Sequence, residues 1–131
     1  MTYELPSAVR GAAAHLATFV GCNAMDLAFI ENATVGCNAV LNSLDLSAGD
    51  EILITDHGYA AIRNAAEHAA RKADARIVET KVSFPVAESK QIVNAVASQL
   101  GPRTRIVILD HITSAYNEST DYQRLSDVFR V

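Results

Sequence analysis

The chain has 131 residues, of which half are hydrophobic and a fifth are charged, and its formal net charge is -4. This length favours a single domain over residues 1–131, and the acidic balance argues against a nucleic-acid-binding protein, which carries a basic surface. No apolar run approaches the roughly 20 residues that span a bilayer, and no secretory signal pattern is present. The two cysteines, Cys22 and Cys37, fit a reduced cytoplasmic protein.

The N-terminal residues predict an amphipathic helix over 6–20, because five apolar residues recur at helical spacing: Leu5, Val9, Ala12, Leu16 and Phe19. The short apolar run 27–30 has strand length. It leads into a second helix, for which Thr34 is the expected N-cap. That helix is expected to end near 47–49.

The rest of the chain alternates strands and helices. Strands are expected at 51–55, 76–82 and 105–110, helices at 59–73 and 88–100, and a capping-box pattern at 120–123 opens a last helix. The continuous apolar run at 52–54 is typical of a strand covered on both faces. The alternation predicts the α/β class: a three-layer α/β/α sandwich with a mainly parallel sheet of about four strands and right-handed crossovers.

Ligands of open α/β sheets bind beyond the carboxyl ends of the strands. Segment 32–38 lies there and offers a helix N-terminus, which attracts anions, together with the Thr34 hydroxyl. Gly36 would let a ligand approach the backbone closely. Plain capping of the helix by Thr34 is the alternative interpretation.

Two further segments lie at strand ends, 56–59 and 110–114. Tyr59 could stack on a planar heterocycle, or it could pack under the following helix with its hydroxyl outward. The pairs Asp56-His57 and Asp110-His111 could ligate a divalent metal or act as an acid and a base, although neither has a recognised ligand spacing.

Three spaced motifs resemble the class V aminotransferase family of fold-type I pyridoxal-phosphate (PLP) enzymes, in particular its isopenicillin N epimerase-like group. They are FIENAT with a following glycine and NAV (29–40), GDEIL with TDH and a tyrosine (49–59), and DHITS (110–114). The resemblance covers roughly residues 5–115 and implies the N-terminal part of a PLP-transferase large domain.

The resemblance also implies roles at individual positions. Ala33, Thr34 and Val35 would hold the cofactor phosphate through the start of their helix. Tyr59 would stack on the pyridine ring, where relatives often place a histidine. His111 and Ser114 would lie near the phenolic oxygen of the cofactor or near the substrate.

The chain departs from the family pattern after residue 114. The family's later strands carry an aspartate that pairs with the pyridinium nitrogen and a lysine that forms the Schiff base. The lysines of this chain are Lys72, Lys81 and Lys90, and none occupies the family's position. The expectation is therefore a truncated domain without PLP catalysis of its own.

Two other hypotheses stay open. The chain could be a small module that binds a phosphorylated or planar ligand through the helix N-terminus at Thr34 and through Tyr59. It could instead be an unrelated small enzyme that uses the two Asp-His pairs. A shortened sheet leaves an open edge, which favours a homodimer, and the predicted C-terminal helix with Tyr122, Leu125 and Phe129 could cover part of that surface.

Overall fold

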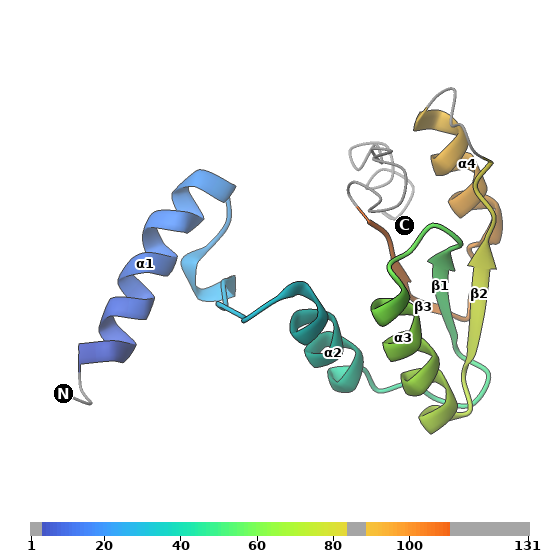
Figure 1. Ribbon diagram of the computed structural model, residues 1–131, viewed down its shortest axis with the longest axis horizontal. Coiled ribbons are helices and arrows are strands. Elements are labelled where there is room, and N and C mark those ends of the chain that lie inside the picture. Colours follow the sequence, from blue (N-terminus) through green and yellow to red (C-terminus); the bar gives the residue numbers. More distant parts are fainter. Residues whose placement is uncertain (1–3, 84–88, 111–131) are drawn as a thin grey trace. The chain divides into compact units, whose positions relative to one another are not determined.

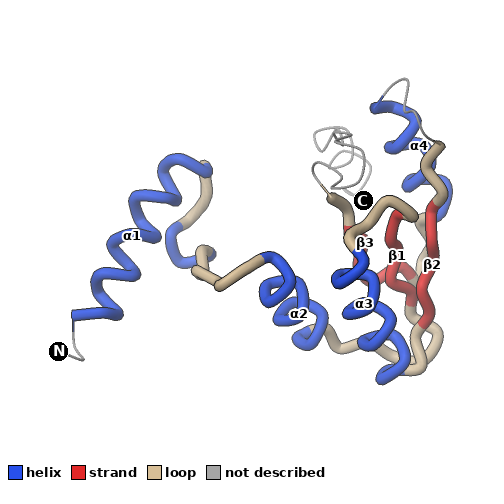
Figure 2. The backbone as a smooth tube through the Cα atoms, in the orientation of Figure 1, coloured by secondary structure: helices blue, strands red, loops and turns tan. Residues whose placement is uncertain are grey.

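The computed structural model describes residues 4–83 and 89–110. The chain divides after Gly36 into two compact units, and the prediction of a single domain stays a prediction. Figure 2 shows the helices, strands and loops of each unit. The predicted last helix, opened by 120–123, lies outside the described residues. No described helix has the length and apolar character needed to cross a bilayer.

The first unit is built on helix α1 (Glu4–Val20), followed by the short 3-10 helix η1 (Ala24–Asp26). Ala13 and Ala17 are the buried residues of α1, at 0% and 5% exposed. Arg10 donates hydrogen bonds from the same side of the helix to the carbonyl oxygens of Ala24 (3.2 Å) and Leu27 (2.8 Å). Gly21, with a φ of 77°, ends the helix in the left-handed region that favours glycine.

The predicted strand at 27–30 is wrong, because the structure has no strand there. Phe29 and Ile30 are 52% and 53% exposed. An apolar run has the composition of a strand, but it becomes one only when a neighbouring strand accepts its backbone hydrogen bonds. No described strand pairs with these residues.

The second unit contains a parallel sheet of three described strands: β1 (Glu51–Thr55), β2 (Arg76–Thr80) and β3 (Thr104–Ile108). The order across the sheet is β2-β1-β3, so β1 lies in the centre (Figure 1). The α/β class and the parallel sheet are confirmed, with three strands in place of about four among the described residues.

Helices cover both faces of this sheet. Ile52 and Ile54 pack against alanines of α3 (Ala60–Ala73), together with Leu41 from α2 (Ala33–Ser43). Leu53 points to the opposite face and packs against Ile92, Val93 and Val96 of α4 (Ser89–Gln99). Successive strand residues face opposite sides, so the unbroken apolar run of β1 is explained by its burial on both faces.

The connections reverse direction at β1. The first, through α3, leads from β1 to β2 at one side; the second, through α4, leads from β2 back across β1 to β3. The second connection runs across the sheet in the opposite direction to the first, and its helix lies on the opposite face. The two crossovers therefore have the same handedness. The position between β1 and β3 is therefore a topological switch point, where open α/β sheets bind ligands.

A polar cluster joins the three strands at their amino ends. The Glu51 carboxylate, at the start of β1, accepts hydrogen bonds from Arg76 on β2 and, at 3.3 Å, from the Thr104 hydroxyl on β3. The Glu51 side chain is 10% exposed. The hydrogen bond from Arg76 lowers the pKa of this carboxyl below its ordinary value of 4.5, against the opposing effect of burial, and Thr104 and the Arg103 charge also lower it.

Replacing Glu51 by glutamine should destabilise the second unit in a pH-dependent way. Because the folded state lowers the pKa of Glu51, its ionised form adds stability above about pH 4.5, and this contribution is lost as the pH falls through the folded-state value. We expect E51Q to be less stable than the wild type at pH 7, with the difference shrinking toward pH 3. Urea unfolding across this pH range measures it.

Glu67→Gln is the matched control, because Glu67 lies 3.8 Å from Arg63 and from Arg71 on the surface of α3. Exposed pairs of this kind contribute about 0–1 kcal/mol. A stability loss in E51Q that is the same at pH 7 and pH 3 would show that the charge of Glu51 does not act as described.

Candidate functional site

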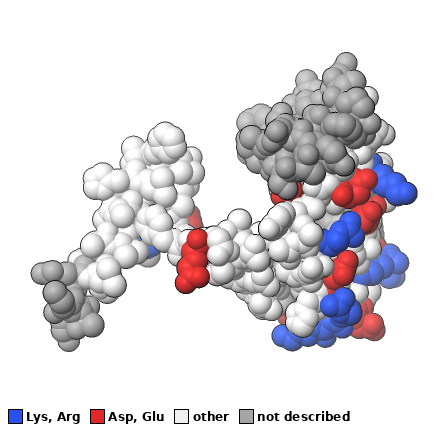
Figure 3. Space-filling model, viewed as in Figure 1, with Lys and Arg blue, Asp and Glu red and all other residues white. Residues whose placement is uncertain are grey.

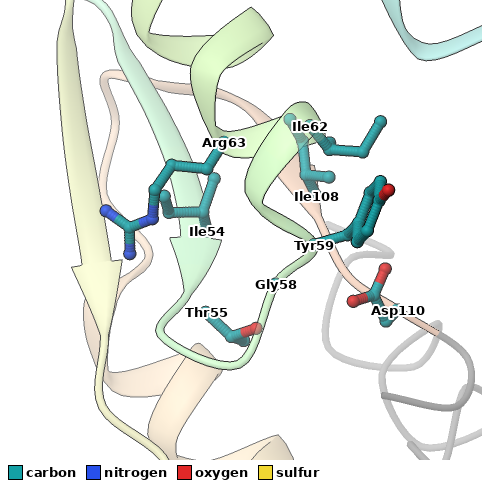
Figure 4. Close-up of a pocket in the computed structure, with 8 residues that line it drawn as sticks. All are labelled: Ile54, Thr55, Gly58, Tyr59, Ile62, Arg63, Ile108 and Asp110. Atoms are coloured by element: carbon teal, nitrogen blue, oxygen red, sulfur yellow. The ribbon is translucent and has the colours of Figure 1, made fainter. Parts of the chain in front are cut away.

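The candidate site lies at the switch point, at the carboxyl ends of β1 and β3. A small cavity there is lined by residues from both strands, the following loop and the start of α3: Ile54, Thr55, Gly58, Tyr59, Ile62, Arg63, Ile108 and Asp110. In Figure 4 the Tyr59 ring and the Asp110 carboxylate lie on one side of this cavity, and the Arg63 guanidinium points away from them. We call this set the switch-point site.

Tyr59 occupies the N-cap position of α3. Its backbone is extended, with φ -62° and ψ 129°, and its carbonyl oxygen accepts hydrogen bonds from the N–H groups of Ile62 (3.0 Å) and Arg63 (3.1 Å). The residue is 53% exposed. This exposure favours a side chain open to stacking over one packed beneath the helix.

The turn before Tyr59 is fixed to the end of β2. The Asp56 N–H donates to the Thr80 carbonyl (3.1 Å), and Asp56 Oδ1 accepts from the Val82 N–H (3.0 Å). The Gly58 N–H donates to the Thr55 carbonyl at 3.2 Å, and a Cβ atom on Gly58 would lie 3.3 Å from that oxygen. Asp56 therefore positions this turn, with His57 Nε2 at 3.8 Å from the same carboxylate oxygen.

The charge at the switch-point site comes from Asp110. Arg63 is the one basic residue among those that line the cavity, and its guanidinium pairs with Glu79 and lies 3.8 Å from Glu67. Asp110 is half-buried at the end of β3. The site thus combines an apolar floor, an aromatic ring and a carboxylate.

The cavity itself has a volume of about 10 Å³. This is room for about one water molecule. A planar ligand would consequently lie against the exposed surface of Tyr59 and not within the cavity.

The predicted anion site, the N-terminus of α2, is capped by Asn32 and not by Thr34. Asn32 Oδ1 accepts a hydrogen bond from the Val35 N–H at 2.9 Å, and the Asn32 carbonyl accepts from Gly36 at 3.1 Å. Thr34 lies one residue inside the helix, which begins at Ala33. The prediction of Thr34 as N-cap is wrong, because the helix begins at Ala33, two residues earlier than that cap requires.

Gly36 meets a side chain of its own unit. A Cβ atom at this position would lie 2.4 Å from Cδ1 of Ile30. The close approach that the glycine permits is therefore made by Ile30, in place of the ligand that the sequence pattern suggested.

Comparison with known proteins identifies the family. The sequence profile described as "Aminotransferase class-V" matches residues 1–130. The chain belongs to the class V aminotransferases. It is 31% identical over 118 residues to isopenicillin N epimerase of Amycolatopsis lactamdurans, covering 88% of this chain and 30% of the relative. The Streptomyces clavuligerus isopenicillin N epimerase is 31% identical over 111 residues, covering 85% and 28%. This class V aminotransferase chain therefore spans about a third of the length of the relatives that it matches.

Solved structures agree with this family assignment. The complex between the cystine C-S lyase C-DES and its reaction product cysteine persulfide matches with a TM-score of 0.84 and 27% identity, covering 97% of this chain and 32% of that one. The cysteine desulfurase CsdA of Escherichia coli matches with a TM-score of 0.79 at 18% identity, which shows the fold alone. The family and the fold class predicted from the sequence are confirmed.

The other site residues and the metal site that the sequence suggested remain to be placed in this class V aminotransferase chain. His111 and Ser114 lie outside the described residues. Within residues 4–83 and 89–110, no group of three or more His, Cys, Asp and Glu side chains could hold a metal ion. The two described cysteines are unbridged, with Cys22 exposed and Cys37 half-buried.

The sequence analysis missed Ile62 and Arg63 as residues of the switch-point site. They follow Tyr59 by three and four positions, the spacing at which helical residues share a face with the residue that begins the helix. That spacing was available in the sequence once Tyr59 was placed at the start of α3.

The capping assignment at α2 can be tested by comparing two alanine substitutions. Asn32→Ala removes the capping side chain and should cost about 0.5–2 kcal/mol of stability. Thr34→Ala, at a position inside the helix, should cost less, because alanine is the better helix former. Chemical unfolding followed by circular dichroism measures both variants, and a larger loss in Thr34→Ala would contradict the assignment.

Proposed function

We propose that residues 1–131 form the portion of a class V aminotransferase large domain that contacts the ring and phosphate of PLP, and that this stretch has no PLP catalysis by itself. The observation that carries the proposal is the half-exposed Tyr59 at the switch-point site, among lining residues that include no lysine. The similarity to relatives supports the choice of ligand. One matching structure, at a TM-score of 0.82 and 27% identity, is a C-DES mutant with glycine covalently linked to the PLP cofactor.

In the second unit, Tyr59 and Asp110 fit non-covalent contact with a planar group. Tyr59 would stack on the ring, and Asp110 is the carboxylate nearest to it among the lining residues in Figure 4. On the family resemblance, Ala33 and Thr34 are proposed to hold the phosphate through the start of α2, where Asn32 already accepts a hydrogen bond from the Val35 N–H. His111 and Ser114 are proposed, on the family resemblance, to lie near the phenolic oxygen. When bound, PLP supplies an electron sink.

The same residues do not fit covalent attachment. The chain has three lysines, each exposed: Lys72, Lys81 and Lys90. Lys72 lines a separate cleft of about 180 Å³ with residues 44–46, at the end of α3 remote from Tyr59. Lys81 follows β2 and Lys90 lies in the first turn of α4, and neither lines the cavity.

A second candidate function is reversible binding of a planar or phosphorylated ligand with no chemistry at all. The exposure of Tyr59 favours it, since a stacking surface needs no covalent anchor. Both candidate functions involve the same ligand. In the first the chain acts as part of a PLP enzyme, and in the second it binds the ligand without any reaction.

We further propose that the chain is a cytoplasmic homodimer. β1 pairs with a strand on each side, whereas β3 pairs with β1 alone among the described strands. Apolar surface that a single copy leaves exposed is a common site of association.

Mixing the protein with PLP and then with borohydride tests both functional proposals. We expect saturable, reversible binding that Tyr59→Ala weakens about threefold to tenfold, the range that aromatic stacking supplies. Tyr59→Phe keeps the ring and should bind like the wild type. Thr34→Ala should weaken the binding of a phosphorylated ligand but not that of an unphosphorylated planar ligand. Absorption titration gives the affinities.

Mass spectrometry after borohydride treatment gives the outcome that decides the first proposal. A single lysine modified in stoichiometric amount would contradict the absence of a covalent anchor. Equal affinity of Tyr59→Ala and the wild type would remove the switch-point site from the proposal.

A further inference from the structure

The switch-point site presents an aromatic ring and a carboxylate together. Tyr59 is 53% exposed, Asp110 is half-buried, and both line the cavity of about 10 Å³ at the carboxyl ends of β1 and β3. Figure 4 shows the ring and the carboxylate on the same side of this cavity. A ligand at the mouth of so small a cavity would therefore contact both groups.

The basic residue of the same cavity is held away from these two groups. The Arg63 guanidinium pairs with Glu79 on β2 and lies 3.8 Å from Glu67 on its own helix. In Figure 4 it points away from Tyr59 and Asp110. Among the described residues that line the cavity, Arg63 is the one cation, so these side chains offer an anion no positive charge on the side of Tyr59. Figure 3 marks the charged residues on one face of the molecule.

An aromatic ring and a carboxylate share a preference for positive charge. The face of an aromatic ring carries the negative part of its quadrupole and attracts a cation within about 6 Å. A carboxylate has two oxygens with about four acceptor positions, so a contact with another residue leaves it able to attract a ligand cation. The two groups therefore favour a ligand that presents a flat face to Tyr59 and a positive charge to Asp110.

We propose that the switch-point site selects planar organic cations, with Tyr59 as the stacking surface and Asp110 as the residue that discriminates by charge. This inference rests on the proposed function, because it concerns a ligand stacked on the same ring. It adds the charge of the ligand, and it assigns Asp110 a role in specificity that stacking alone does not require.

Two planar probes without a phosphate test the selection. Nicotinamide is neutral, and 1-methylnicotinamide has nearly the same shape with a positive charge on its ring. We expect the wild type to bind the cation about threefold to tenfold more tightly, since an exposed ring face and a nearby carboxylate each contribute a small factor. NMR titration measures both affinities at low ionic strength. The preference should shrink as salt is added, because salt screens exposed charges.

Asp110→Asn keeps the shape of the side chain and removes its charge, so the preference for the cation should fall to about twofold or less. Asp110→Glu should retain most of it. Asp74→Asn is the matched control: Asp74 is exposed and ends α3 at the opposite end from Tyr59, with a φ of 55° that asparagine also adopts. D74N removes the same charge and should keep the wild-type preference.

The outcomes separate charge selection from the ring contact. A wild type that binds both probes equally, with both weakened by Tyr59→Ala, leaves the proposed ring contact standing and overturns the charge selection. So does a wild type that binds PLP and neither probe. A wild type that binds neither PLP nor the probes overturns the proposed function and this inference with it.

The role of Asp110 has its own tests. A preference that persists in D110N, or that D74N reduces by the same factor, overturns the assignment to Asp110. Circular dichroism spectra confirm that each variant is folded. The salt titration of the wild type needs no variant, and a preference that does not change with added salt would contradict selection by charge.

Discussion

The burial of β1 on both faces and both edges is the constraint on which the second unit depends. Its five residues are all buried, with parallel partners along both edges and a helix over each face. Each fully buried Ile or Leu side chain contributes about 1.5–3 kcal/mol, so Ile52, Leu53 and Ile54 anchor the two halves of the core at once. The polar residues at the two ends of β1 then need hydrogen-bond partners. Glu51 has such partners at the amino end, and the turn at Asp56 follows the carboxyl end.

The switch-point site follows from this arrangement and not from any special sequence at the site. Because β1 is the central strand, the loop after Thr55 lies beside both the start of α3 and the end of β3. Asp56 then fixes the loop to the residues after β2, and Gly58 permits the tight turn that places Tyr59 at the start of α3. The exposure of Tyr59 is thus a product of the topology, whereas the stability of the unit is determined at the strand centres. Because Tyr59 is 53% exposed, substitutions there should have little effect on folding.

Much of this architecture could be predicted from the sequence because it is local. The strand at 51–55 agrees with the observed bounds, and the helix predicted at 59–73 begins one residue early. The failures concern features that depend on a partner strand or on the exact residue at which a helix begins. The run at 27–30 has a strand composition without a strand partner. The cap of α2 depends on whether the helix begins at Ala33 or later, and Asn32 and Thr34 are each acceptable caps by residue type. The role of Gly36 required knowledge of where Ile30 lies.

In the second unit, the contacts that build the core are largely separate from the exposed ring at the switch-point site. The three described strands and the helices α2, α3 and α4 supply the core of the second unit on both faces of its sheet. A PLP reaction makes a different demand, since it needs a positioned amine at the ring in addition to a stacking surface. The switch-point site offers an aromatic ring and a carboxylate, and the residues that line its cavity include no lysine. Ordered structure around β1 therefore depends on buried residues such as Ile52 and Leu53, whereas Tyr59 at the switch-point site is 53% exposed.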